Sequence, residues 1–549
     1  MLIENKHHTM KKILLSFVLA LTLAASAQER KPQTGFDISR NLEVFADIYR
    51  QLDMYYVDTL SADTAVRWAI DGMLSEIDPF TIYYPGDDEE ELKTMTTGRY
   101  AGIGAIIRPY KQEDRAAIEE PYEGSPAQEA GVRAGDVILT IDGKDVKGWP
   151  ISEVSKNLRG EAGTTFELCV KREGEKKPLA FRITRRQIQT PAVPWYGIVD
   201  EQAHVGYLYL SSVTDHCSRD VRYAVTELKQ QGMERLIIDL RDNPGGAVVE
   251  AVEIVGMFVP RGSLVVSTRG KVESMCHEYR TPAEPIDTVM PLAVLVNGGS
   301  ASASEIISGA LQDLDRAVIL GQRTYGKGLV QGIRELPYHG HLKITTARYY
   351  IPSGRCIQAY DYRHRTIDGA ATTLPDSLTR EFHTRLGRPV RDGGGILPDS
   401  VLVVDSVPTM VYDLYNSDAF FNYANHFVAA HPSVVAPADF HLTDEDYAAF
   451  VDAIAASDFT YNARSVAALN QVRQVARIEG RYEEVQEDFN RLEAKLKANN
   501  LRADLERFRS HIQKYLETEL VSRYYYQRGA LQHQAQNDKA IRKAVETLR

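Results

Sequence analysis

Three serine hydroxyls are grouped in residues 297–305, whose sequence is NGGSASASE. The apolar run 292–296 before them predicts a buried strand, and residues 303–314 predict a helix. A turn from a strand into a helix can present a serine Oγ at the edge of a sheet, as the nucleophile elbow of α/β-hydrolases does. The free N–H groups of the first helical turn would stabilise developing negative charge. The residues alone leave open which of Ser300, Ser302 and Ser304 would be the nucleophile.

A second strand end carries unusual residues. The buried strand predicted at 236–240 ends in the sequence DLRDNPGG, residues 239–246. The paired glycines Gly245 and Gly246 allow the backbone to direct its N–H groups outward.

A serine nucleophile needs a base, and Lys327 is a candidate. It lies among small and apolar neighbours in TYGKG, where Gly326 and Gly328 permit close backbone approach. Removal from water would lower the pKa of its ammonium group enough for the amine to take the serine proton. Gln331 lies four positions on, which returns to the same side of either a strand or a helix, so it could hold the amine. Taken alone, Lys327 is more commonly interpreted as a surface lysine on a loop.

The elements that must position these groups form a multidomain α/β chain. Strands alternate with helices over residues 190–404, which predicts a mainly parallel sheet with its functional groups at the carboxyl ends of the strands. Residues 28–97 have the apolar spacing of helices, residues 98–187 that of short strands and turns, and the chain beyond 408 is mostly helical. Packing, capping or self-association is the expected role of these terminal helices.

Composition agrees with several folding units. The chain has 549 residues, 44% hydrophobic and 25% charged, which suits three or four globular domains. Its 64 basic and 75 acidic residues give a net charge of -11, which argues against a nucleic-acid partner or an anionic membrane surface.

The N-terminal segment predicts export to the periplasm. Lys11 and Lys12 precede an apolar stretch, and Ala25-Ser26-Ala27 has the pattern of a signal-peptidase site, so residues 1–27 are predicted to be a signal peptide with Met10 as its natural start. The apolar stretch is shorter than the roughly 20 residues needed to span a bilayer. An oxidising compartment permits disulfides, so Cys169, Cys217, Cys276 and Cys356 could be paired or could be free buried thiols.

The stretch GSPAQEAGVRAGDVILTIDG, with GIGA upstream, resembles the PDZ domain of bacterial secreted proteases. The resemblance implies that protein or peptide C termini bind at Gly102, Ile103, Gly104 and Ala105. Backbone N–H groups of such a loop can hold a terminal carboxylate, and a strand edge beside a helix can accept an extended peptide.

The strings VLVNGGSASASEIISGALQD, RTYGKGLVQ and DLRDNPGG resemble the C-terminal processing peptidases, secreted serine proteases with a Ser/Lys site and an inserted PDZ domain. The resemblance implies Ser302 as nucleophile, Lys327 as general base, Gln331 as the supporting amide, and the N–H groups of Gly246 and Ala303 as the oxyanion hole. It implies no metal or other cofactor. Asp313 matches an acidic position that affects activity in some members, although a structural role is expected here.

The resulting domain prediction is a signal peptide at 1–27, an N-terminal helical cap at 28–97, a PDZ domain at 98–187, a protease core at 188–405 and a C-terminal helical region at 406–549. The family-like GGGILPDSV at 393–401 would close the core. The expected partners are substrate C termini and, through the terminal helices, further copies of the chain. Neither a nucleic acid nor an integral membrane span is expected.

Two other functions remain open at this stage. A Ser-His-Asp hydrolase could use His339 or His341, although the sequence YHGH predicts an exposed hairpin turn for both. A PDZ scaffold on a protease-like core without turnover could act as a periplasmic adaptor.

Overall fold

The computed structural model describes residues 33–549 except 367, 404–405, 462–463 and 498–500. The predicted signal peptide therefore lies outside the described residues. The chain divides into two units, Met1–Pro79 and Phe80–Arg549. In the described part of the first unit, the two helices are α2 (Gln33–Tyr55) and α3 (Ala62–Ser75), and α3 begins at an N-cap supplied by the Ser61 side chain.

The second unit contains a six-stranded sheet that is parallel except for its first strand. The strands, in their order across the sheet, are β10 (Trp195–Asp200), β11 (Val205–Tyr209), β12 (Arg235–Asp239), β15 (Leu292–Val296), β16 (Val318–Gly321) and β23 (Ser400–Val401). Strands β11, β12 and β15 are followed in the chain by the helices α7 (Cys217–Gln230), α8 (Val248–Gly256) and α9 (Ala303–Asp313). The predicted α/β architecture is confirmed.

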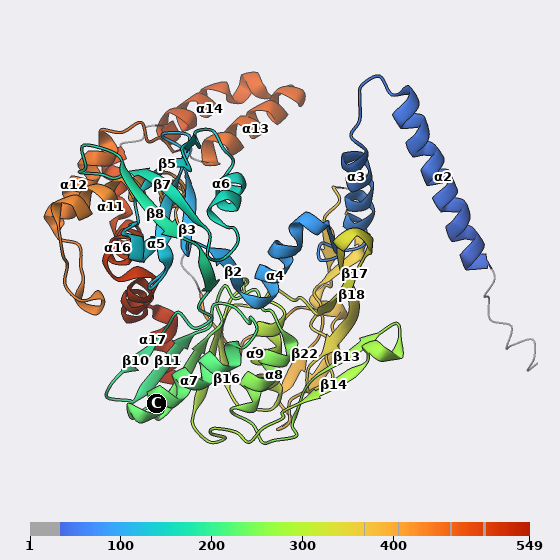
Figure 1. Cartoon of the computed structure of the whole chain (residues 1–549). Helices are drawn as coiled ribbons and strands as arrows, with labels where there is room; N and C mark the ends of the chain where they lie inside the picture. The colour runs from blue at the N-terminus through green and yellow to red at the C-terminus, as the bar shows by residue number, and fades with distance from the viewer. Residues whose placement is uncertain (1–32, 367, 404–405, 462–463, 498–500) are drawn as a thin grey trace, which may run out of the picture. The chain divides into compact units, whose positions relative to one another are not determined.

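Alternating side chains of this sheet enter two separate cores, because successive residues of a strand face opposite sides. Leu236 and Ile238 of β12 pack with α7, α8 and α9, whereas Ile237 packs with the last helix of the chain, α17 (Lys539–Leu548). Figure 1 shows α17, in red, beside strands of the same sheet. Helix α17 of the C-terminal region therefore covers one face of the six-stranded sheet.

The loops around the site are supported by a second sheet and two small hairpins. The second sheet contains β1 (Ile82–Tyr84), β13 (Leu264–Gly270), β14 (His277–Arg280), β17 (Leu329–Glu335) and β18 (His341–Tyr350). The hairpins are β19 (Tyr360–Arg365) with β20 (Ala371–Thr373), and β21 (Glu381–His383) with β22 (Pro389–Arg391). Within the region 28–97, which the sequence predicts to be mainly helical, residues 82–84 form the strand β1, which pairs with β18 more than 250 residues later.

A small β-rich domain lies between α4 (Glu89–Thr97) and the parallel sheet. Its elements are β3 (Ala105–Tyr110), β4 (Arg115–Pro121), α5 (Pro126–Ala130), β5 (Val137–Ile141), β6 (Lys144–Asp145), α6 (Ile151–Leu158), β7 (Thr165–Lys171) and β8 (Leu179–Thr184). Entry and exit strands β2 (Arg99–Gly102) and β9 (Arg186–Gln189) pair with each other, so the domain joins the rest of the chain through a two-stranded ribbon.

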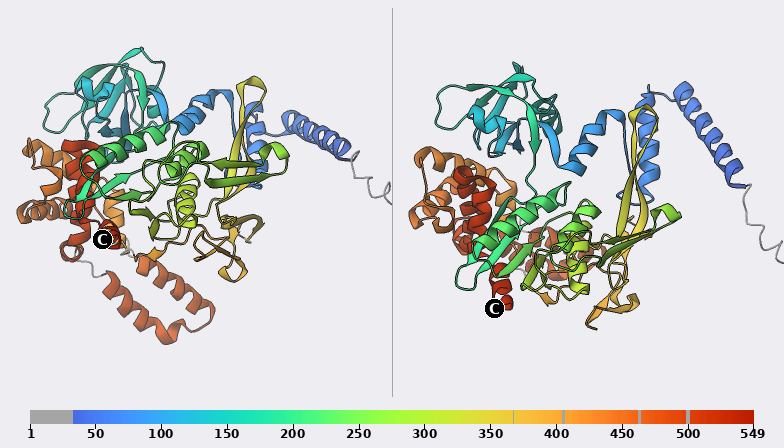
Figure 2. Two further views of the ribbon diagram at one scale, coloured as in Figure 1. Left: turned by 90° about the horizontal axis from the view of Figure 1, so that it is seen from below. Right: turned by 60° about the horizontal axis from the view of Figure 1, so that its bottom comes forward.

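The C-terminal region is helical. Its other helices are α10 (Thr409–Asn416), α11 (Ala419–Ala430), α12 (Asp444–Ala455), α13 (Arg464–Ile478), α14 (Tyr482–Lys497), α15 (Leu501–Arg507) and α16 (Arg509–Asn537). Figure 2 shows α13 and α14 side by side as a helical hairpin. Helices α13 and α14 thus pack against each other within one chain.

Candidate functional site

Ser302 lies on the sharp turn between β15 and α9. Its backbone has φ 55 and ψ -115, a region that non-glycine residues rarely adopt outside strained functional turns. Ser300 and Ser304 are fully buried, and their hydroxyls donate to the carbonyl oxygens of Leu240 and Asn243, at 2.7 and 3.0 Å. Ser302 is the one of the three that is partly exposed. The two flanking serines hold the turn, and Ser302 is the one available for chemistry.

The loop after β12 packs directly against this turn. A Cβ added to Gly245 would lie 2.5 Å from the Ala301 carbonyl oxygen and 2.6 Å from the Ala303 nitrogen, so only glycine permits this approach. The Asn243 carbonyl oxygen accepts hydrogen bonds from the Ala301 N–H and the Ser304 hydroxyl. Within the described part of the chain, the N–H groups of Gly246 and Ala303 donate to no acceptor. These two donors therefore remain available beside Ser302.

Glu305 connects the serine turn with the lysine loop, and sequence reasoning missed it. Its fully buried carboxylate accepts hydrogen bonds from the backbone N–H groups of Ser302, Gly326 and Lys327 at 2.7–2.8 Å, and from the Thr324 hydroxyl at 2.5 Å. Burial raises the pKa of the Glu305 carboxyl to about 7, although the four hydrogen bonds act to lower it. The spacing Ser-x-x-Glu at a predicted helix start was the available signal.

Tyr349 connects the same two residues on their carbonyl side. Its buried hydroxyl lies 3.1 Å from the Ser302 carbonyl oxygen and 2.5 Å from the Lys327 carbonyl oxygen, close enough to donate to either. Burial raises the pKa of this phenol well above its usual value, so it stays protonated and remains a donor. Glu305 and Tyr349 together hold the main chains of Ser302 and Lys327 in a defined relation.

Lys327 is partly buried in the loop that leads into β17. Its Nζ lies 4.2 Å from the centroid of the Phe80 ring. The prediction that its flanking glycines permit close approach is confirmed: a Cβ on Gly326 would lie 2.4 Å from Ala359 Cβ, and one on Gly328 would lie 2.8 Å from Gln358 N. The loop is therefore held between the serine turn and the chain segment that contains Ala359.

Other predicted site residues have different surroundings. The Gln331 amide donates to the Thr345 hydroxyl at 3.2 Å. Asp313 forms a fully buried ion pair with Arg355, at 2.9 Å, which agrees with the structural role expected for it. His339 and His341 lie at the tip of the β17–β18 hairpin, and in the described part of the chain neither forms a hydrogen bond with Ser302.

The β-rich domain has an unpaired strand edge next to a helix. Its sheet begins with β3, which among the residues that the structure describes pairs only with β4, and α6 lies against β3. The predicted loop, residues 102–105, spans the end of β2, the connection Ile103-Gly104 and the start of β3. Gly104 has φ 72, and a Cβ there would meet Ser125 at 2.6 Å. Among the described residues, the N–H groups of Ile103 and Gly104 donate to no backbone acceptor. The arrangement can accept an extended peptide that ends at this loop.

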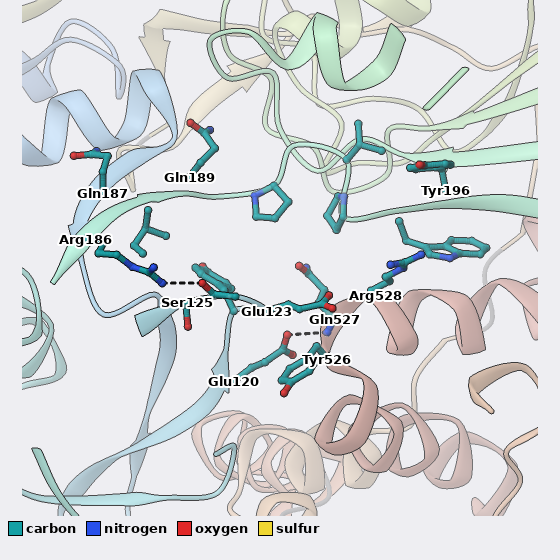
Figure 3. Close-up of a pocket in the computed structure, with 17 residues that line it drawn as sticks. Glu120, Glu123, Ser125, Arg186, Gln187, Gln189, Tyr196, Tyr526, Gln527 and Arg528 are labelled. Carbon is teal, nitrogen blue, oxygen red and sulfur yellow. Dashed lines mark hydrogen bonds between the residues drawn. The ribbon is translucent and has the colours of Figure 1, made fainter. Parts of the chain in front are cut away.

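A cavity of about 640 Å³ separates this domain from the ribbon strand β9 and helix α16. Figure 3 shows Glu120 of β4 pointing to Gln527 of α16, whose N–H donates to it at 2.7 Å. The Tyr526 hydroxyl accepts a hydrogen bond from Gln128, and Tyr526 interrupts α16 with φ 57. Burial raises the pKa of the Glu120 carboxyl to about 7. The β-rich domain and the C-terminal helices are thus in direct polar contact.

The four cysteines are free thiols in this structure, but only Cys217 is buried as the unpaired alternative expected; Cys169 and Cys356 are partly buried and Cys276 is exposed. Within the described residues, no group of histidine, cysteine, aspartate and glutamate side chains could hold a metal ion. No helix in the described part of the chain is both long and apolar enough to cross a membrane.

Comparison with known proteins identifies three regions. Residues 204–364 match the model of peptidase family S41, residues 118–172 match a PDZ domain, and residues 410–548 match the C-terminal helical domain of probable PDZ-proteases. The fold and the matches define the class as a serine peptidase that carries a PDZ domain, a module that binds peptide C termini.

Individual relatives agree with this class. A carboxy-terminal-processing protease of Bartonella bacilliformis is 34% identical over 344 residues, which are 62% of this chain and 78% of that protein. A probable CtpA-like serine protease of Staphylococcus aureus is 33% identical over 58% of this chain and 62% of its own length. The solved photosystem II D1 C-terminal processing protease has 28% identity, covers 66% of this chain and 93% of its own, and gives a TM-score of 0.37. The chain belongs to the carboxy-terminal-processing proteases of peptidase family S41.

Proposed function

We propose that the chain is a tail-specific endopeptidase in which Ser302 is the nucleophile and Lys327 the general base. The observation that carries the proposal is the double connection between them: Glu305 accepts from both backbone N–H groups, and the Tyr349 hydroxyl contacts both carbonyl oxygens. A Ser/Lys pair needs this mutual positioning, because proton transfer requires a maintained short distance between hydroxyl and amine.

In the proposed reaction, the neutral Lys327 amine takes the hydroxyl proton as Ser302 Oγ attacks the scissile carbonyl carbon. The N–H groups of Gly246 and Ala303 donate to the oxyanion of the tetrahedral intermediate. Collapse of the intermediate breaks the C–N bond, and the Lys327 ammonium returns its proton to the leaving amine. Water then hydrolyses the acyl-enzyme with the same lysine as base. In this scheme Gln331 supports the amine, although its amide donates to Thr345 in the present structure.

The PDZ domain is proposed to hold the substrate C terminus at residues Gly102, Ile103, Gly104 and Ala105. The free edge of β3 beside α6 and the donors of Ile103 and Gly104 support this assignment. A substrate whose terminal carboxylate is amidated should therefore show a KM raised about tenfold or more at unchanged kcat, as expected when a charge-assisted contact is lost. Equal KM values for the two substrates would contradict tail recognition at this loop.

The catalytic assignment is tested with Ser302→Ala and Lys327→Arg, each compared with the double variant His339→Ala/His341→Ala. Both Ser302→Ala and Lys327→Arg should lower kcat at least a thousandfold. The alanine removes the proposed nucleophile, and the arginine keeps the positive charge but cannot act as a base. The histidine variant should retain the wild-type rate. A serine-reactive phosphonate should modify Ser302, identified by peptide mass spectrometry. An active Ser302→Ala variant would refute the assignment, and loss of activity only in the histidine variant would favour the Ser-His-Asp alternative.

Export and domain limits complete the proposal. Residues 1–27 are proposed as the signal peptide of a periplasmic protein, followed by the helical cap at 28–97, the PDZ domain at 98–187, the protease core at 188–405 and the helical region at 406–549. N-terminal sequencing of the mature protein should begin at Gln28. A mature protein that retains residues 10–27 would contradict export by cleavage.

Self-association through the N-terminal unit is also proposed. Helix α2 exposes large apolar side chains, among them Phe36, Leu42 and Ile48, with 67%, 62% and 55% of their surface accessible. Such a surface is expected to be covered in an oligomer. Sedimentation should give a mass above that of one chain, and Leu42→Asp/Ile48→Asp should lower it. A monomeric wild type would contradict this part of the proposal.

A further inference from the structure

Helix α17 begins beside the loop that carries the proposed oxyanion donor Gly246. Asp538 is its N-cap, and its carboxylate accepts the N–H groups of Ala540 and Ile541 at 2.7 and 3.1 Å. The same carboxylate forms an ion pair with Arg241, at 2.8 Å, across 297 positions of sequence. The C-terminal helical region therefore contacts this loop with a charged group, in addition to the apolar contacts that α17 makes with the sheet.

Arg241 is the point at which this loop is held. Its guanidinium donates to both carboxylate oxygens of Asp239 at 2.5–3.0 Å, and Asp239 is almost fully buried and also accepts the Tyr207 hydroxyl. The remaining guanidinium nitrogen donates to Asp538. Arg241 lowers the pKa of the Asp538 carboxyl although burial acts to raise it, so Asp538 is ionised at neutral pH.

The residue after Arg241 joins the two active-site loops. Asp242 has φ 59, and its N–H donates to the Asn297 side chain at 2.9 Å, while the Asn297 amide donates back to the Asp242 carboxylate at 3.0 Å. Asn297 begins the turn that contains Ser302. A positive φ at a non-glycine residue has to be maintained by its surroundings. Arg241 is fixed immediately before this strained position, and its anchors are Asp239 in the sheet and Asp538 in the helical region.

We propose that Asp538 is a positioning residue for acyl transfer: through Arg241 it fixes the segment that leads to the Gly246 N–H, so the C-terminal helical region contributes to the geometry of the oxyanion hole. This inference rests on the proposed function, because it assumes that Ser302 is the nucleophile beside this donor. Asp538 itself contacts no reacting atom. Its effect should therefore appear in the transition state, where the oxyanion forms, and not in substrate binding.

The test is Asp538→Asn in the full-length protein. Asparagine is as good an N-cap as aspartate, so α17 should keep its start, while the charge that holds Arg241 is lost. We expect kcat to fall about tenfold, the size of effect that a small displacement of a catalytic group produces, with KM within twofold of wild type. The rate constant for phosphonate modification of Ser302 should fall by a similar factor, because that reaction also develops negative charge on oxygen.

Asp200→Asn is the matched control. Asp200 forms an ion pair with Arg549 at the other end of the same helix, at 2.6 Å, and its carboxylate also accepts a backbone N–H, from Ala203. Both variants remove one carboxylate charge that holds the α17 region to the core, but only Asp538 contacts the catalytic loop. The control should keep the wild-type kcat and phosphonate rate. Asp538→Glu, which restores the charge, should recover part of the loss.

Active-site titration separates positioning from folding. If Asp538→Asn lowers the titrated fraction of sites while each remaining site keeps the wild-type kcat, the residue is only structural and the inference is wrong. Equal kcat values for the Asp538 and Asp200 variants would also overturn it. Failure of the proposed function is visible separately, since wild-type protein would then not be modified at Ser302.

Discussion

Glu305 shows how one side chain can determine the geometry of the proposed catalytic pair, Ser302 and Lys327. Its four hydrogen-bond partners are all donors. An ionised carboxylate can accept all four hydrogen bonds, whereas a protonated carboxyl group has one oxygen that carries a proton and cannot accept them as well. Burial nevertheless brings its pKa to about 7. The ionised form is thus the structurally matched one, and its population changes within the physiological pH range.

Activity should therefore fall as the pH is lowered through about 7, since protonation of Glu305 removes an acceptor from the Ser302 and Lys327 loops. Protonation of the proposed base Lys327 would act in the same direction. Glu305→Gln should lower kcat at least tenfold even at pH 8, because its amide nitrogen would face N–H donors. Pre-steady-state and steady-state pH profiles measure this. A variant with wild-type kcat would contradict the role assigned to Glu305.

The stability of the fold should depend on pH in the opposite sense to activity, because the contribution of Glu305 decreases as the pH rises. The native pKa lies above that of an ordinary glutamate, so the protonated form favours the native state. This contribution is complete below about pH 4 and is lost as the pH rises through 7, with a slope of up to about 1.4 kcal/mol per pH unit. In denaturant unfolding, the free energy of unfolding of the wild type relative to that of Glu305→Gln should therefore decrease as the pH rises from about 4 through about 7. Glu517→Gln, a buried carboxyl in the helical region, is the control and should leave the activity profile unchanged.

At the scale of elements, the site depends on two strand-end loops that meet at the carboxyl edge of the sheet. Gly245 is the contact point, because its missing side chain leaves room for the turn around Ser302. Parallel strands place successive loops at one edge, which is why the loops after β12 and β15 can bring the proposed oxyanion donor and the proposed nucleophile to the same site.

Gly245→Ala should lower kcat at least a hundredfold, because its Cβ would displace the Ala301–Ala303 backbone from a position only 2.5–2.6 Å away. Gly262→Ala is the matched control: its φ of 82 is close to the 91 of Gly245, but no atom lies within 4 Å of the added Cβ. The control should cost about 1 kcal/mol of stability through backbone strain and leave kcat unchanged. Equal losses of kcat in the two variants would show that strain, and not collision, is responsible.

At the scale of the whole molecule, the helical C terminus has parts of different importance. Helix α17 buries Ile541, Ala544, Val545 and Leu548 against the catalytic sheet. In the hairpin of α13 and α14, Leu469 is the only buried side chain among those described, and Val472, Val475 and Leu492 are exposed. Helix α17 completes the core against the sheet, and the hairpin of α13 and α14 contributes few buried side chains.

Deletion of residues 539–549 should therefore abolish soluble expression or lower the melting temperature by more than 10 °C, because an apolar sheet face would be exposed. Replacement of residues 464–497 by a short Gly/Ser linker should change the melting temperature by only a few degrees and leave kcat unchanged. Thermal unfolding and peptide cleavage measure both. Comparable destabilisation by the two deletions would contradict this division of the helical region.

The sequence by itself determined the elements whose signals are local. The buried strand at 292–296, the helix that follows it, the alternation that makes the sheet parallel and the glycines around Lys327 could all be predicted, because apolar periodicity and backbone freedom are properties of neighbouring residues. The PDZ and peptidase motifs indicated the family in the same way, through contiguous strings.

Only the tertiary structure decided how distant residues meet. Burial of Ser300 and Ser304 distinguishes them from Ser302. The spacing of residues in the sequence does not separate the three serines. The β1 strand, the Tyr349 contact and the Arg241–Asp538 ion pair each join segments far apart in the chain. No local pattern encodes such pairings, since they arise when apolar faces pack and bring polar groups of separate elements within hydrogen-bonding distance.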